Sequence, residues 1–285
     1  MLKKYSHKRI FEHLCELVES KGIIKTHGRG RPCKIPKHQL ICYILFQKCY
    51  DNVLEEMELD SELYLGTHYD HGTFSYHYKK LDPSVIEEIV WHYERLIVQY
   101  LEHDIAFHIF DSTAISTSVN EERLNQGTRR KEKLTQKVHT CLGYDPPKQL
   151  VVVEGCKATT SQVSDSKGAI LMLRDDMSGY ALGDAAYETY ELIESTEKYG
   201  LCPIYRAQNR PVKRKFSAKK RARDNWDKNA KRIYQEIRGV GEVLYGAATR
   251  AGLLKSECRL VENQHRDSLV ISLRQNMLTF LRLEA

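Results

Sequence analysis

Strand-length apolar runs alternate with helix-length amphipathic segments after about residue 103, and this alternation restricts that region to an α/β fold. Strands are predicted at 106–111, 137–143, 149–155, 179–184 and 201–206. The second and third form a hairpin around the turn Tyr144-Asp145-Pro146-Pro147. Helices are predicted at 166–174, 187–199, from about 227 through 244, and 269–283. This order predicts a mixed sheet with helices on both faces.

Residues 1–103 show helical periodicity, so we expect an all-helical N-terminal domain ahead of an α/β domain over 104–285. Helices are predicted on the apolar face that starts at Ile10, over 37–49, within 53–65, from Thr73, and from Pro83 to about 103. The helix from Thr73 is compatible with the recognition element of a helix-turn-helix. Many small helices share that pattern, so the sequence leaves this choice open.

The composition is typical of a globular protein, because 41% of the 285 residues are hydrophobic and 29% are charged. No apolar stretch approaches the ~20 residues of a membrane helix, and residues 1–7 lack the apolar core of a signal peptide. The eight cysteines are scattered without a Cys-x-x-Cys pair. His68-x-x-His71 with His77 lacks a cysteine or acid that would complete a zinc site. We therefore expect a cytoplasmic protein with buried, reduced thiols.

Three acids carry the strongest chemical signal. Asp111 and Asp184 each follow a short apolar run, and Glu242 lies one helical turn after Arg238. An acid just past a buried strand is held rigidly while its carboxylate still reaches solvent. Oxygen ligands fixed in this way suit hard divalent ions such as Mg²⁺, and two such ions can clamp the reacting oxygens of a phosphodiester. The acids predict metal-dependent chemistry on nucleic acid, with Glu236 as a rival for the third position.

Basic residues are concentrated in the stretches between these acids. Residues 206–232 include twelve Lys or Arg and two Asp, in a chain whose net charge is +6. A second cluster contains Arg129, Arg130 and Lys131. Positive charge around carboxylates lets a polyanion approach them, although a solvated surface is the alternative for either run. Gly28-Arg29-Gly30-Arg31-Pro32 resembles the core of a minor-groove AT-hook, with a basic interhelix loop as the alternative.

Each acid also has a purely structural explanation. Asp111 and Asp184 could end a turn or cap a helix, as Asp165 is more simply expected to do. Glu242 could pair with Arg238 at the i, i+4 spacing. The residues alone leave both explanations open.

Four short motifs occur in an informative order: Phe110-Asp111-Ser112-Thr113, Val163-Ser164-Asp165-Ser166-Lys167, Leu182-Gly183-Asp184-Ala185-Ala186-Tyr187 and Arg238-Gly239-Val240-Gly241-Glu242. With them, residues 107–283 resemble a bacterial or archaeal insertion-sequence transposase of the DDE type. The resemblance implies a ribonuclease H-like mixed sheet flanked by helices. It places the family's three acids on Asp111, Asp184 and Glu242.

The resemblance has departures around its third acid. The family often has a tyrosine three residues before the arginine and a lysine seven residues after the glutamate. Gln235 and Thr249 stand at those positions, while Tyr234 and Arg250 are each one residue away. The departures concern the residues expected to contact a flipped base or the phosphate at the transposon end. They do not change the three acids.

The resemblance implies cleavage at transposon ends and strand transfer into target DNA. Two Mg²⁺ ions, for which Mn²⁺ can substitute, would bind Asp111, Asp184 and Glu242. The implied partner is double-stranded DNA, namely terminal inverted repeats and target, with a homodimer in a cytoplasmic, nucleoid-associated complex. The residues expected to bind DNA are Arg29, Arg31, Arg129, Arg130, Lys213, Arg214 and Arg238. The alternatives are an inactive transposase-derived DNA-binding protein and a ribonuclease H-like nuclease.

Overall fold

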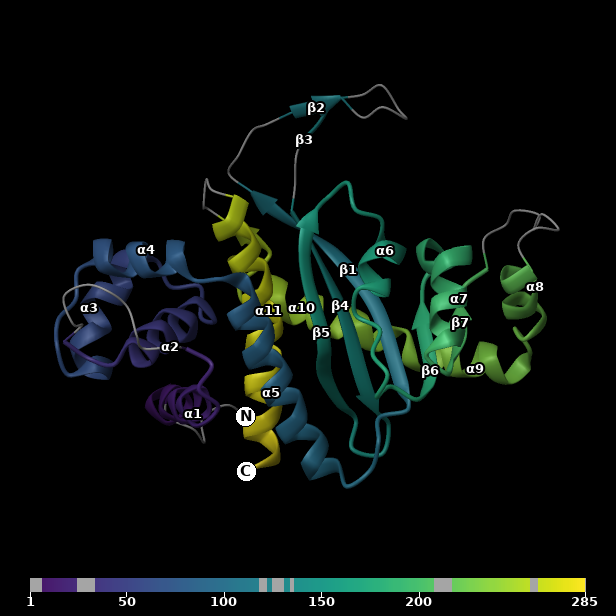
Figure 1. Cartoon of the computed structure of the whole chain (residues 1–285), viewed down its shortest axis with the longest axis horizontal. Helices are drawn as coiled ribbons and strands as arrows, with labels where there is room; N and C mark the ends of the chain where they lie inside the picture. Colours follow the sequence, from purple (N-terminus) through teal and green to yellow (C-terminus); the bar gives the residue numbers. More distant parts are fainter. Residues whose placement is uncertain are drawn as a thin grey trace.

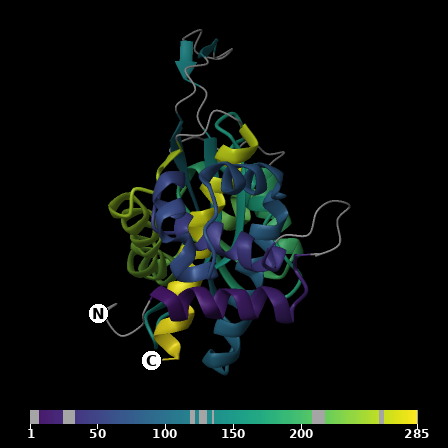
Figure 2. The ribbon, with the colours of Figure 1, turned by 90° about the vertical axis from the view of Figure 1, so that its left-hand side faces the viewer.

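The computed structural model describes residues 7–24, 34–117, 122–124, 131–133, 136–207, 217–256 and 261–284. A twisted central sheet stands beside a group of N-terminal helices (Figure 1). In the view turned by 90°, those helices lie in front of the sheet and hide most of it (Figure 2). Within the described ranges, no helix has the length and apolar character needed to cross a membrane.

The main sheet has the strand order β5-β4-β1-β6-β7. Its strands are β1 (Phe107–Thr117), β4 (Gln136–Asp145), β5 (Leu150–Thr160), β6 (Gly179–Gly183) and β7 (Leu201–Tyr205). β4 and β5 form the predicted hairpin, and β4 is antiparallel to β1, whereas β6 and β7 continue the sheet in parallel. The predicted mixed sheet is therefore confirmed.

Three very short strands were not expected. β2 (Glu122–Leu124) and β3 (Lys131–Lys133) pair with each other and project beyond the end of the sheet (Figure 1). β8 (Lys255–Ser256) pairs with the last two residues of β1. Segments of two or three residues are too short to show an alternating pattern, so sequence periodicity cannot identify them.

Helices cover both faces of the sheet. On one face lie α5 (Pro83–Leu101), α9 (Lys228–Ile237), α10 (Gly239–Arg250) and α11 (Val261–Leu283). On the other lie α6 (Asp165–Ile170), α7 (Tyr190–Lys198) and α8 (Ser217–Asp224). The N-terminal helices are α1 (His7–Ser20), α2 (Lys37–Lys48), α3 (Leu54–Leu65) and α4 (His71–Lys80). Their apolar side chains join the same core as α5 and α11, so the helical region and the sheet share packing.

Several helices differ from their predicted bounds, and α6, for example, ends at Ile170 rather than at 174. The helix predicted through residues 227–244 is divided at Arg238, where the Gly241 N–H donates to the Arg238 carbonyl only three residues back. Gly239 and Gly241 weaken the helix at that point, since each costs ~1 kcal/mol relative to Ala. α8 lies in the basic run, which lacks apolar periodicity. α11 begins eight residues earlier than expected because polar residues such as Asn263 and Arg266 are buried in its first turns.

Polar side chains of α11 cover the β5 edge of the sheet. β5 is an edge strand, and unpaired backbone groups on such a strand invite association with other chains. The buried Asn276 amide accepts from the Val153 N–H at 2.6 Å and donates to the Val153 carbonyl at 2.8 Å. Its amide nitrogen also donates to the Val90 carbonyl of α5 at 3.0 Å. One side chain therefore ties α11, α5 and β5 together.

Replacing Asn276 with leucine should lower the free energy of unfolding by about 2–5 kcal/mol, because several buried backbone groups each lose a partner worth ~1–3 kcal/mol. Urea denaturation measures this change. Gln275→Leu is the matched control, because Gln275 is only half-buried and donates to the Thr279 hydroxyl at 3.0 Å and to the Val151 carbonyl at 3.4 Å. That carbonyl keeps the Thr279 hydroxyl as a donor at 3.0 Å when the Gln275 amide is removed. If both variants lost the same small amount of unfolding free energy, Asn276 would not be what stabilises the β5 edge of the sheet.

Candidate active site

Asp111, Asp184 and Glu242 line one pocket of about 160 Å³. Asp111 lies on β1, Asp184 directly follows β6, and Glu242 is in the first turn of α10. β1 and β6 are parallel and pair only over residues 107–109 of β1, so the two strands separate just before Asp111. Ligand sites of open α/β sheets form at the carboxyl ends of such strands. Arg238 and Tyr234 complete the polar lining of this pocket.

Asp111 is half-buried and firmly held. Its Oδ1 accepts the Ser112 N–H at 2.8 Å. Burial, together with the negative charge of Asp184, raises the pKa of Asp111 to about 6, although the Ser112 N–H and the Arg238 guanidinium act in the opposite direction. A carboxylate whose ionised form is disfavoured by burial and by a neighbouring acid gains most from a cation.

Asp184 and Glu242 are both exposed to solvent at the pocket. The Oδ1 of Asp184 accepts the Ala186 N–H at 2.7 Å, so this acid also caps the 3₁₀ helix Ala185–Tyr187. In the described part of the chain, Glu242 forms no ion pair with Arg238, which lies 6.0 Å from the centre of the Tyr234 ring. Glu236, the rival acid, points elsewhere: it pairs with Arg232 at 3.9 Å and does not line the pocket.

Gly241 explains how α10 approaches the first acid. A Cβ atom added to Gly241 would lie 2.9 Å from Oδ2 of Asp111, closer than carbon and oxygen normally approach. The glycine therefore allows helix backbone to lie against the carboxylate, next to Glu242. From the sequence, this glycine could equally have been a weak point of the helix.

The pocket suits a hard divalent cation. Its three acids offer oxygen donors from three separate elements. Burial, and after it the negative charge of Asp184, raises the pKa of Asp111, and a bound cation would favour its ionised form. Magnesium is commonly held by one or two carboxylates together with water and substrate phosphates. Asp111, Asp184 and Glu242 are the residues that would hold it.

The match to known sequences covers this pocket. The sequence model of the transposase DDE domain family matches residues 102–268, which is more than half of the chain. The chain belongs to this family. The predicted family and the predicted ribonuclease H-like fold are thereby confirmed, and transposase activity in the general sense follows from membership. No curated protein matches the chain.

Most of the predicted DNA contacts of this transposase lie outside the described residues, namely Arg29, Arg31, Arg129, Arg130, Lys213 and Arg214. Arg238 lines the pocket. Part of the basic run between the second and third acids is used within the fold, because Arg221 of α8 pairs with Glu197 and Arg223 pairs with Glu188, each at 2.5 Å. A count of basic residues in that run therefore overstates the charge available to DNA.

Two of the three histidines considered above as zinc ligands contact the same carboxylate. His68 and His71 both face the carboxylate of Glu58, at 3.5 and 2.8 Å. The six described cysteines are free, and five of them are buried, whereas Cys202 is exposed.

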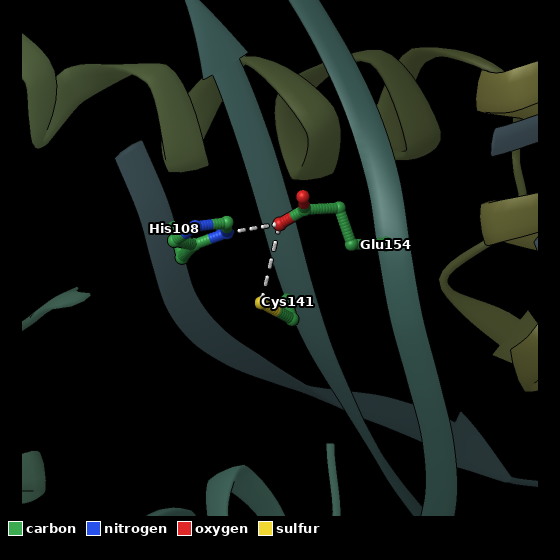
Figure 3. Close-up of side chains that lie close together, drawn as sticks. All are labelled: His108, Cys141 and Glu154. Atoms are coloured by element: carbon green, nitrogen blue, oxygen red, sulfur yellow. Dashed lines mark hydrogen bonds and ion pairs between the residues drawn. The ribbon is translucent and has the colours of Figure 1, made fainter. Parts of the chain in front are cut away.

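A second cluster, which the sequence did not reveal, lies inside the transposase sheet. His108, Cys141 and Glu154 come from β1, β4 and β5, and their side chains converge (Figure 3). The register shift between Cys141 and Leu142 leaves Glu154 without a partner on β4 and turns its carboxylate toward the other two. Bulges commonly redirect a side chain in this way. Periodicity alone gives no sign of where a register will shift.

Hydrogen bonds within this cluster favour an ion pair over a metal. The His108 Nδ1 lies 2.7 Å from the Glu154 carboxylate, and its Nε2 lies 2.9 Å from the Ser178 carbonyl. Both ring nitrogens face acceptors, which only the doubly protonated imidazolium satisfies. Burial lowers the pKa of His108, but the Glu154 carboxylate and the Ser178 carbonyl outweigh it and raise the pKa overall. The Cys141 thiol donates to the same carboxylate at 3.7 Å.

His139, a different histidine, should make the stability of the transposase depend on pH. Burial lowers the pKa of His139 to about 4, although Asp165 acts in the opposite direction. The unfolded chain binds this proton below about pH 6.5, whereas the folded chain resists it until about pH 4. Stability due to neutral His139 is therefore present above pH 6.5 and declines as the pH falls toward 4.

Replacement of His139 by glutamine should flatten this part of the pH dependence. Its Nε2 is 2.8 Å from the Thr159 hydroxyl, a contact that a glutamine amide can approximate. Urea denaturation of the two proteins at pH 7.5 and pH 5 measures the difference. If the variant lost as much stability on acidification as the wild type, another group would be responsible.

Proposed function

We propose that this transposase cleaves DNA at the ends of its element and joins the freed 3′-hydroxyl groups to target DNA, using Asp111, Asp184 and Glu242. The observation that carries the proposal is the common pocket of these acids, which come from two strands and a helix. Family membership supports a DNA substrate. Two copies of the chain would act together, because a transposition complex must hold two ends.

Each polar residue of the pocket has a distinct task in this proposal. Asp111 and Asp184 would hold the divalent ions from adjacent strands, and Glu242 would complete their binding from α10. Bound there, Mg²⁺ supplies Lewis acidity and lowers the pKa of an attacking water. Arg238 lines the same pocket without an ion-pair partner among the described residues, which leaves its guanidinium available to a phosphate.

Tyr234 is a further candidate to contact the substrate. It lines the pocket, and its buried hydroxyl has no hydrogen-bond partner in the part of the chain that the structure describes. A buried hydroxyl without a partner is costly, and a phosphate oxygen would satisfy it. The sequence placed Tyr234 one residue from the family's usual tyrosine, and its place in the pocket supports an equivalent role.

The N-terminal helices would hold the duplex while the pocket acts on it. We assign residues 1–103 to DNA binding and residues 104–285 to catalysis. α4 exposes Tyr76, Lys79 and Lys80, and its C-terminal end is fixed to α11 because Arg266 donates to the carbonyls of Lys79 and Leu81. A duplex bound on α4 would thus be held rigidly relative to the catalytic sheet. The complex would form in the cytoplasm, on the nucleoid.

The experiment uses the purified full chain with Mg²⁺ or Mn²⁺ and a duplex that carries the element's own terminal inverted repeats. The expected products are a nick at the repeat end, with a free 3′-hydroxyl, and its joining to a second duplex. An RNA–DNA hybrid of the same sequence is the comparison. Cleavage of the hybrid alone would indicate a nuclease. Binding of the repeats without any cleavage in either metal would indicate a DNA-binding protein that has lost catalysis.

A further inference from the structure

α10, which carries Glu242, is intrinsically a weak helix. Gly239, Gly241 and Gly246 lie within it, and each glycine in a helix costs ~1 kcal/mol relative to alanine. Its buried residues are Gly241, Leu244, Tyr245 and Ala248, of which only Tyr245 carries a polar side-chain group. The position of this helix must therefore depend on what these few side chains contact.

Tyr245 reaches the backbone of the first acid. Its hydroxyl lies 2.9 Å from the Thr140 hydroxyl and 3.4 Å from the Asp111 carbonyl oxygen. The Thr140 hydroxyl also lies 3.4 Å from that carbonyl, and Thr140 is the register partner of Asp111 on β4. The two hydroxyls have one proton each. One proton joins them to each other, and the second is donated to the Asp111 carbonyl, whichever hydroxyl serves as the inner donor.

This contact links the two halves of the metal site. Tyr245 lies three residues, nearly one helical turn, after Glu242, so fixing its hydroxyl fixes both the rotation of α10 and its position along β1. We propose that Tyr245, through Thr140 and the Asp111 carbonyl, is a positioning residue that holds Glu242 against Asp111 for metal binding. The inference rests on the proposed function, because it assumes that these acids bind divalent metal.

The alternative is that the two hydroxyls only satisfy each other in the core. The same chain contains a matched example of that simpler case. The Thr196 hydroxyl lies 2.8 Å from the Tyr205 hydroxyl, and both residues are buried and do not line the pocket. Tyr205→Phe therefore removes an equivalent bond and reports its purely structural cost.

The experiment compares Tyr245→Phe with Tyr205→Phe in the full chain. Mn²⁺ affinity is measured from the paramagnetic resonance signal of free Mn²⁺, and the site is defined by the binding that Asp184→Asn abolishes. Tyr245→Phe should weaken this binding by about threefold to tenfold, the loss expected for one hydrogen bond, whereas Tyr205→Phe should leave it unchanged. Amide hydrogen exchange over 239–250 should accelerate only in Tyr245→Phe.

Thr140→Val gives an independent measure of the same contact. Thr140→Val should weaken Mn²⁺ binding in the same direction, and the double variant should lose less than the product of the single losses, because both changes break one shared contact. Equal Mn²⁺ affinity in Tyr245→Phe and Tyr205→Phe would overturn the inference, whether or not exchange in α10 changes. Absence of any Mn²⁺ site in the wild type would instead refute the proposed function.

Discussion

Replacing Asp111 with asparagine should reduce Mg²⁺-dependent nicking at the transposon end by about a thousandfold or more, because a metal-bound transition state loses several kcal/mol of stabilisation. Duplex binding should remain within about twofold of wild type, since one buried acid contributes little to phosphate contacts. The fold should persist. An asparagine Oδ1 can still accept the Ser112 N–H, and burial makes ionisation of the Asp111 carboxyl less favourable than in water, since its pKa is raised to about 6.

Glu236→Gln is the control for this experiment. Glu236 is an exposed acid of α9 that pairs with Arg232 and lies outside the pocket. Its replacement should leave nicking close to the wild-type rate. Nicking by Asp111→Asn within tenfold of wild type would contradict the assignment of the first acid, and a comparable loss in both variants would point to an indirect effect of charge.

A single methyl group at Gly241 should reduce nicking by about a hundredfold, the cost of misplacing a catalytic group by roughly an ångström. The added Cβ would lie 2.9 Å from Oδ2 of Asp111, so either the carboxylate or α10 must move. The free energy of unfolding should rise slightly or stay nearly unchanged, because alanine favours a helix over glycine by about 0.5–1 kcal/mol. Thermal unfolding and a nicking assay on the same preparation measure the two effects.

Gly246→Ala separates the clash from the change in helix propensity. Gly246 lies in the same helix, and its added Cβ would meet only the Arg250 guanidinium at 3.6 Å, an ordinary contact. This variant should gain helix stability without losing activity. A similar loss of nicking in both alanine variants would mean that flexibility of α10, rather than its contact with Asp111, limits the reaction.

The main features of the fold were predictable because each depends on local pattern. The first part of β1, before Asp111, is mainly apolar on both faces, since α5 and α11 cover one side of the sheet and α6 and α7 the other. The same pattern placed Asp111 and Asp184 at strand ends. The structure brings both to one pocket, but β1 continues past Asp111 to Thr117, so the predicted end of this strand was wrong, because residues 112–117 lack the apolar run that marked its first part. Local turn residues such as Pro146 and Pro147 were enough to identify the hairpin.

Features that depend on register or on distant partners were not predictable. The bulge beside Cys141 brings Glu154 to His108, two residues 46 positions apart. Asn276 is buried because its amide matches free backbone groups on β5, 123 positions away. The Tyr245 hydroxyl of α10 likewise reaches the carbonyl of Asp111, 134 positions away. The spacing of apolar residues along the sequence carries no information about such long-range pairings.

The most direct test of the central claim is the location of bound metal. Crystals of the full chain with a transposon-end duplex and Mn²⁺, measured at a wavelength where manganese scatters anomalously, reveal each ion independently of activity. We expect anomalous peaks in the pocket of Asp111, Asp184 and Glu242, and their loss in Asp184→Asn. Manganese bound only elsewhere, for example between His108, Cys141 and Glu154, would contradict the account.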